Sequence, residues 1–212
     1  LLADAGADVR VVVATDGEAT IGSPHTPEAT AARRRREAVE ACAILGVGAP
    51  VFLGLRDGGL AEHGAALASG IAGVHDALDP QLVLTPWPLD RHPDHRRCAA
   101  AVGDVVDDAT EVWGYEAHVP LTPTRTVDVS AVVDRKRAAL RAHVTAGLAM
   151  DLEATLGLNR WRSLPVSGGT GHAEAFLGLD GAAWRRAVAV AEGRPGPLSP
   201  PAGEARPPRA SG

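Results

Sequence analysis

Three short runs of apolar, mostly β-branched or leucine residues restrict the fold of this chain more than any other feature. They read VRVVVAT, VFLGL and QLVLT and cover residues 9–15, 51–55 and 81–85. None alternates regularly between apolar and polar residues, which is typical of strands buried on both faces, as in a parallel sheet. Each run is followed by a polar loop and then by a stretch long enough for a helix. The alternation predicts an α/β domain with a mostly parallel, doubly wound sheet.

The order of the predicted elements is that of a Rossmann-like domain over residues 1–192. In the first half we expect helices over residues 28–45, ended by Gly46, then 61–78 and about 95–106. The second half is less regular, with strands expected over 111–117 and 125–129 and helices over 130–147, 151–158 and 180–192. Residues 193–212 are rich in Pro, Gly and Arg and are predicted to be a disordered tail.

The first eight residues read as the last turns of a helix that ends at Gly6. In a parallel α/β sheet each helix follows a strand, yet no strand precedes this one, and the chain does not begin with Met. We therefore expect that the domain lacks its first strand and the loop after it. A processed or mispredicted start would look the same.

Charge, hydropathy and cysteine content argue against nucleic-acid binding and membrane insertion and indicate the cellular setting. The net charge is −5 and Lys136 is the one lysine among 21 basic residues, so no basic face for nucleic acid is expected. No apolar run is long enough for a membrane span, and no signal peptide is visible. Cys42 and Cys98 lie in Ala-rich helical stretches, which predicts buried free thiols and a cytoplasmic setting. A homo-oligomer is compatible with these properties.

Three polar loops follow the predicted strands, at residues 16–18, 56–59 and 90–95. Doubly wound sheets bind ligands outside the carboxyl ends of their strands, so these loops are the expected site.

The loop at 90–95 carries the densest group of chemically useful side chains, Asp90, His92, Asp94 and His95. Imidazole and carboxylate are ligands of zinc in hydrolases, and a carboxylate such as Asp94 could fix the tautomer of an acid/base histidine such as His92. The alternative is a capped turn, with Pro93 at the first helical position and Asp90 or His92 as the cap. The His-x-x-His spacing does not decide between them, but the place after a buried strand favours a site.

Other candidates are weaker on their own. Arg34 and Glu37 fit either a solvated helical face or a pair that projects into the cleft, where Arg34 would hold substrate hydroxyls or a phosphate. Glu18 either shapes a turn at Gly17 or contacts substrate, and Asp90 is also assigned to substrate binding. A lone histidine such as His172 is more often structural than catalytic. The five remaining histidines have no spacing signal: His25, His63, His75, His118 and His143.

Taken together, these segments resemble the PIG-L/LmbE family of zinc-dependent de-N-acetylases. The resemblance covers nearly the whole chain before the tail. Its segments are VRVVVATDGEAT (9–20), RRREAVEACAILGV (34–47), VFLGLRDGGL (51–60), LVLTPWPLDRHPDHRRCA (82–99), VDVSAVVDRKRAALRAH (127–143) and HAEAF (172–176).

The resemblance implies roles for five residues. His95 would be a zinc ligand, and His92 would be the general acid that protonates the leaving amine and stabilises the oxyanion. Asp94 would orient His92 and tune its charge, and Arg34 would bind substrate. His172 falls where many relatives have a tyrosine that contacts the oxyanion.

The sequence departs from the family at its first motif. That motif resembles A-H-P-D-D-E or P-H-P-D-D and supplies two zinc ligands and the Asp that acts as general base. It does not occur here, and the opening residues 1–4 resemble the helix that follows it. With one of three ligands, a chain that truly starts at Leu1 is expected to bind zinc poorly.

Two functions remain open from the sequence. The first is a zinc-dependent hydrolase that removes an acetyl group from an N-acetylglucosaminyl-type substrate, a small-molecule N-acetylated sugar conjugate. The alternative is a truncated, non-catalytic family member that binds only sugar or a partner.

Overall fold

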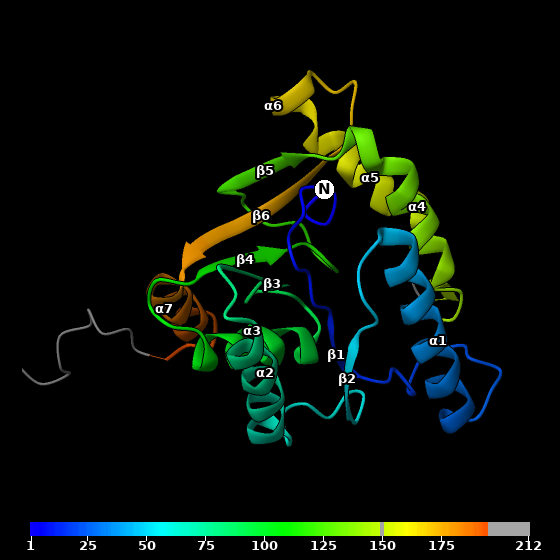
Figure 1. Ribbon diagram of the computed structural model, residues 1–212, viewed down its shortest axis with the longest axis vertical. Helices are drawn as coiled ribbons and strands as arrows, with labels where there is room; N and C mark the ends of the chain where they lie inside the picture. Colours follow the sequence, from blue (N-terminus) through cyan, green and yellow to red (C-terminus); the bar gives the residue numbers. More distant parts are fainter. Residues whose placement is uncertain (149–150, 195–212) are drawn as a thin grey trace, which may run out of the picture.

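The computed structural model describes residues 1–148 and 151–194 (Figure 1). Its first half alternates strands with helices, as predicted. The elements are β1 (Val12–Thr15), α1 (Pro27–Leu45), β2 (Val51–Leu55), α2 (Gly64–Leu78), β3 (Leu82–Pro86) and α3 (Pro93–Val105). Gly46 ends α1 in the left-handed conformation, with φ of 74°, which confirms the predicted stop.

The second half contains shorter and less regular elements. They are β4 (Glu111–Tyr115), β5 (Arg125–Asp128), η1 (Ser130–Val132), α4 (Val133–Ala142), η2 (Ala146–Leu148), α5 (Leu152–Arg162), α6 (Leu164–Ser167), β6 (Ala173–Asp180) and α7 (Gly181–Ala191). The prediction of one helix over 130–147 was wrong, because two short 3₁₀ turns flank α4. Strand β6 was not predicted, since periodicity does not assign a short apolar run.

The strands form two hydrogen-bonded sheets. β1 and β2 pair in parallel, and the second sheet has the order β3-β4-β6-β5. β3 and β4 are parallel, whereas β6 runs antiparallel to both of its neighbours. The α/β class is confirmed, with two parallel pairs in the predicted alternation and an antiparallel addition at the other end. Pro86 pairs with Tyr115 and Tyr115 with Phe176, so the carboxyl ends of β3 and β4 lie beside the first part of β6.

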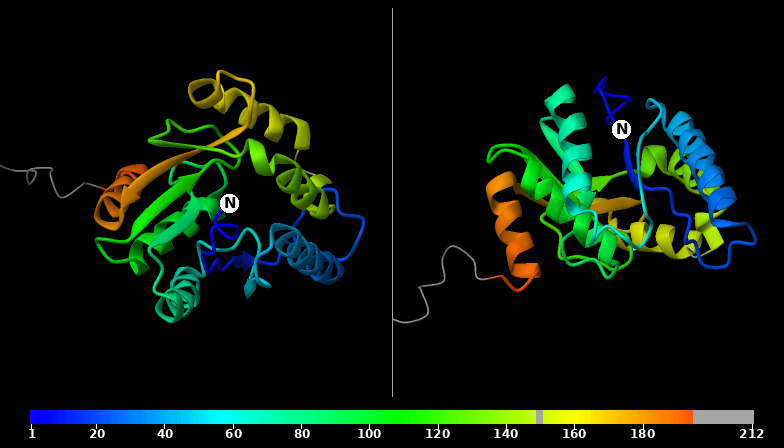
Figure 2. Two further views of the ribbon diagram at one scale, coloured as in Figure 1. Left: turned by 45° about the horizontal axis from the view of Figure 1, so that its top comes forward. Right: turned by 90° about the horizontal axis from the view of Figure 1, so that it is seen from below.

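Helices cover both sides of the four-stranded sheet (Figure 2). α3 and α7 pack on one face, where the fully buried Trp184 donates its indole N–H to the Ala99 carbonyl at 2.9 Å. Val112 of β4 lies in the same core cluster. On the other face α5 packs against β6, and next to it α4 packs against α1 (Figure 2). The two cysteines are free, as predicted: Cys42 is buried and Cys98 half-buried.

The first residues form one hydrogen-bonded turn and not a helix. The Ala7 N–H donates to the Leu2 carbonyl at 3.1 Å, and Gly6 has φ of 83°. The predicted disordered tail lies outside the described residues except for Gly193 and Arg194, whose N–H groups bond back to the end of α7. Within the described ranges, no helix is both long and apolar enough to cross a membrane.

Candidate active site

The three predicted loops meet at the carboxyl edge of the strands. The Asp57 N–H after β2 donates to Glu18 Oε1 after β1 at 2.8 Å. From the same β2 loop, the N–H groups of Gly58 and Leu60 donate to the Asp94 carboxylate at 2.7 and 3.2 Å. The prediction that these loops gather at one site is confirmed, and backbone donors hold them together.

His92 is the N-cap of α3, so the capped-turn interpretation is correct for this residue. Its φ and ψ are −77° and 127°, and its Nδ1 accepts the Asp94 N–H at 3.2 Å, with Pro93 at the start of the helix. Because Nδ1 accepts, the proton of the neutral ring lies on Nε2. The cap therefore fixes the tautomer that a proton donor needs, and the structural and chemical interpretations are compatible.

The expected pairing of the Asp94 carboxylate with His92 is not formed. Asp94 is 5% exposed, and its carboxylate accepts hydrogen bonds from the N–H groups of Gly58 and Leu60. The contact to His92 comes from the Asp94 backbone N–H. Asp94 thus orients His92 through the main chain, and its charge anchors the β2 loop.

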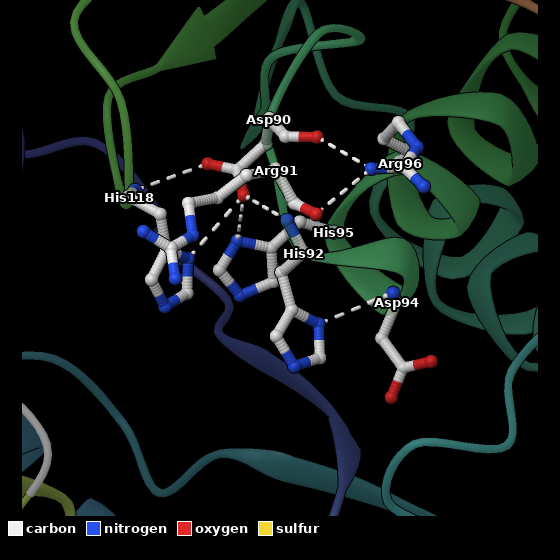
Figure 3. Close-up of polar contacts among 7 residues, drawn as sticks. All are labelled: Asp90, Arg91, His92, Asp94, His95, Arg96 and His118. Carbon is white, nitrogen blue, oxygen red and sulfur yellow. Dashed lines mark hydrogen bonds and ion pairs between the residues drawn. The ribbon is translucent and has the colours of Figure 1, made fainter.

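Asp90 lies at the centre of a group of three imidazole rings (Figure 3). It is 1% exposed, and its oxygens accept the N–H groups of His92 at 2.8 Å and His118 at 3.1 Å. Oδ1 also lies 3.2 Å from His95 Nδ1 and 3.3 Å from His118 Nδ1. Burial acts to raise the pKa of Asp90, but the two backbone N–H groups and the histidine charges outweigh it, so the pKa is lowered. Asp90 lies behind the histidines, where it positions them.

The rings of His92, His95 and His118 lie side by side. Their centroids are 4.9 Å apart for His92–His95, 4.7 Å for His95–His118 and 5.5 Å for His92–His118. In Figure 3 the second nitrogen of each ring points away from Asp90. Burial, with the neighbouring histidine charges, lowers the pKa of His95 against the opposing effect of Asp90. His95 is therefore neutral at pH 7, the form that binds metal ions.

His118 was missed from the sequence because it stands alone in the loop after β4. Parallel pairing of β3 with β4 brings the loops that follow them to the same edge. The one available signal was this position after a strand, which requires the sheet order.

The loop that carries His118 is held by a buried ion pair. Arg162 of α5 bonds Glu116 through both its Nε, at 3.2 Å, and its terminal nitrogen, and it also donates to the Leu121 carbonyl at 2.6 Å. The side chains of Arg162 and Glu116 are 8% and 7% exposed. The Leu121 N–H donates to Glu116 at 2.8 Å, which closes the loop.

Arg34 and Glu37 bond different partners in the described structure. Arg34 donates to Thr20 Oγ1 at 2.9 Å and lies against Gly17, where a Cβ atom would overlap its guanidinium. Glu37 accepts the N–H and hydroxyl of Thr145 and so joins α1 to the chain after α4. Arg34 lies next to the β1 loop but has no bond to the histidine group within the described ranges.

Glu18 and His172 differ in how they are connected to the histidine group. Glu18 is linked to it through the β2 loop, and its Oε2 is buried without a hydrogen-bond partner in the described structure. His172 precedes β6, and its main chain bonds Val129 and Ser130. Of the described side-chain bonds, none joins His172 to the three rings.

Fold and site together define an α/β protein with a histidine–carboxylate group at the carboxyl edge of its strands. The family model for PIG-L, GlcNAc-PI de-N-acetylase, matches residues 1–106, which is half of the 212 residues. The chain belongs to the PIG-L family.

Several solved structures share the fold of this chain. N,N'-diacetylchitobiose deacetylase from Pyrococcus horikoshii has a TM-score of 0.72 and 22% identity, over 85% of this chain and 76% of that one. The conserved protein TT1542 from Thermus thermophilus has a TM-score of 0.67 and 28% identity, over 83% of each chain. The 4-carboxy-2-hydroxymuconate hydratase from Pseudomonas putida has a TM-score of 0.62 and 20% identity, over 84% of this chain and 86% of that one. Since a hydratase shares the fold, the reaction has to be argued from the site.

Proposed function

We propose that this chain is a zinc-dependent hydrolase that removes an acetyl group from an N-acetylglucosaminyl-type compound. The family description and the chitobiose deacetylase of similar fold support this class of substrate. The observation that carries the proposal is the state of His92. Its Nδ1 is occupied by the Asp94 N–H, so its Nε2–H is a free donor beside His95.

His92 supplies a hydrogen bond in the proposed reaction. Its Nε2–H would stabilise the developing oxyanion, while the departing amine takes up the proton that the attacking water gives up, so the ring stays neutral. His95, neutral and in contact with Asp90, is the neighbouring residue that would bind the metal ion. A zinc ion bound there would polarise the amide carbonyl and lower the pKa of a water molecule. The half-buried, neutral His95 next to the Asp90 carboxylate fits such a ligand.

Substrate would be held by residues of the β1 loop and α1. Arg34, fixed by Thr20, offers guanidinium N–H groups to sugar hydroxyls. Glu18 has a buried Oε2 without a partner in the described structure, and this oxygen would accept a hydrogen bond from a substrate hydroxyl. His172 is proposed as a second donor to the oxyanion, since β6 begins near the edge where β4 ends.

The proposal is tested by amine release. The protein is loaded with zinc and incubated with a panel of N-acetylglucosaminyl compounds. Release of acetate and a primary amine that stops with a chelator and returns with zinc would support it. No release from any N-acetyl sugar would overturn it, and saturable sugar binding without turnover would favour the non-catalytic alternative.

His92→Asn separates the chemical role of His92 from its role as a cap. Asparagine is a good N-cap, so α3 should keep its stability, whereas the Nε2–H of the ring is lost as a hydrogen-bond donor. We expect kcat to fall by about 10²- to 10³-fold with an unchanged melting temperature. His92→Ala should lose activity and also about 1 kcal/mol of stability. Full activity in His92→Asn would remove His92 from the mechanism.

A further inference from the structure

We propose that Asp90, His95 and His118 form a metal-binding site of their own, for a divalent ion of the zinc class, on the Nδ1 side of His95. One ligand atom from each of the three residues lies within 4.8 Å of the others. Two imidazoles and one carboxylate are a common donor set for zinc and cobalt. The family motif does not include His118, and the site depends on it.

The Oδ1 atom of Asp90 faces more nitrogen atoms than it can bond. Oδ1 already accepts the His92 N–H at 2.8 Å, and the Nδ1 atoms of His95 and His118 both face the same oxygen. An oxygen has two lone pairs, so it cannot form good hydrogen bonds with all three nitrogens. Indeed His95 Nδ1 is buried, and no hydrogen bond to it is formed in the described structure. A cation between these atoms would be bound by all three through their lone pairs.

The spacing of the donor atoms suits tetrahedral coordination. Asp90 Oδ1 lies 3.2 Å from His95 Nδ1 and 3.3 Å from His118 Nδ1. For zinc–ligand bonds of about 2.0 to 2.1 Å, neighbouring ligands of a tetrahedron lie about 3.3 to 3.4 Å apart. The ligand atoms of His95 and His118 lie within 4.8 Å of each other.

The site is both accessible and held in place. Asp90 is fixed by two backbone N–H groups, and the loop of His118 is fixed by the buried pair of Glu116 and Arg162. The side chains are 0% exposed for Asp90, 29% for His95 and 44% for His118, so the group opens to solvent at His118. Three protein ligands with an open fourth position are typical of zinc sites that exchange a water molecule.

This site and the His95 Nε2 position exclude each other, because a neutral imidazole has one nitrogen lone pair. Removing His118 therefore separates the two. If the ion binds at Nδ1 of His95, His118 is required. If it binds at Nε2, with Asp90 acting only as the partner of Nδ1–H, His118 is not required.

The experiment measures binding of Co²⁺ alone to the 212-residue chain, without substrate, by calorimetry and by visible absorption. We expect one ion per chain and a four-coordinate spectrum. His118→Ala should bind at least about tenfold more weakly, since one of three protein ligands is lost. His63→Ala is the matched control, because His63 is exposed and makes no side-chain cap bond. Thermal melts of all three proteins check that each is folded.

Equal binding by the wild type and His118→Ala would overturn the proposal, as would no binding by the wild type. A second measurement identifies the atom: ¹⁵N shifts of the histidine rings with Zn²⁺ should place the ion on Nδ1 of His95, and a shift at Nε2 would contradict it. Since no substrate is present, failure here leaves the proposed deacetylation to be judged by amine release alone.

Discussion

The two halves of this chain contribute to the candidate site in different ways. Residues 1–106 alternate strands and helices, the described strands there run parallel where they pair, and each polar loop directly follows a strand. In the described part of residues 107–194, β6 runs antiparallel to both of its neighbours, and the ion pair that holds the His118 loop joins residues distant in sequence. The first half supplies His92 and His95 from a recognisable motif. The second half supplies His118 and the ion pair that positions it, which no local pattern reveals.

The largest effect is expected where the second half holds the His118 loop. Arg162→Met leaves Glu116 buried without its partner, and breaking such a pair costs about 3 to 5 kcal/mol. The free energy of unfolding in urea measures it.

Arg160→Met on the same helix is the control, because Arg160 is exposed and bonds only the main chain at Thr170 and Gly171. Similar losses for the two variants would show that the buried pair does not hold the second half. The comparison between the halves would then lose its energetic basis.

A smaller effect is expected at Asp94, which holds the loops of the first half together. Asp94→Asn replaces one acceptor of the Gly58 and Leu60 N–H groups by a donor, and hydrogen bonds to a charged group contribute about 1.5 to 3 kcal/mol. We expect a loss of about 2 kcal/mol in unfolding free energy. Asp104→Asn, on the exposed side of α3, should lose none.

The same variant tests what Asp94 does to His92. Because the main-chain N–H of Asp94 makes the contact, folded Asp94→Asn should keep this hydrogen bond and the proton of the neutral ring on Nε2. A ¹⁵N spectrum of the folded variant with the proton on Nδ1 of His92 would show that the carboxylate acts on His92 directly, as the resemblance implied.

Cys98 of α3 gives a pH-dependent test of how tightly the first half is packed. Burial, with a contribution from Asp94, raises the pKa of its thiol from 9.0 to about 11. An acid whose pKa is raised by folding stabilises the fold below its unfolded pKa. Stability should therefore be lost as the pH rises from about 9 towards about 11.

The measurement is urea unfolding across this pH range, with Cys98→Ser as the comparison. The serine variant should lack this part of the alkaline loss, and the native thiol should react slowly with alkylating reagents at about pH 8. Fast alkylation of Cys98 in the folded protein would show that α3 opens readily.

The sequence predicted those features that depend on neighbouring residues. The runs VRVVVAT, VFLGL and QLVLT marked the three strands of the first half, and Gly46 marked the end of α1, because a left-handed residue there favours glycine. The meeting of the three loops followed from the rule that parallel strands end at one edge.

What the sequence could not supply are contacts between distant segments. Asp94 was expected to use its carboxylate on His92, only two residues away, but two backbone donors from the β2 loop compete for it. Glu37 pairs with Thr145, 108 residues along the chain, instead of Arg34. His118 joins the site only through the β3–β4 pairing. Each depends on sheet order or helix packing, which periodicity does not encode.

The smallest effect is expected where the two halves touch at the surface. Arg135 of α4 forms a two-bonded ion pair with Asp4 of the opening turn, with distances of 2.7 and 2.8 Å. Both side chains are solvated, at 36% and 45% exposure, so the attraction is offset by ordering and screened by salt. Arg135→Ala should leave the urea midpoint unchanged, and added salt should not alter that result. A clearly lower urea midpoint at low salt would mean that the opening turn helps to hold the two halves together. The contact between the halves would then extend beyond the core around Trp184 and Ala99.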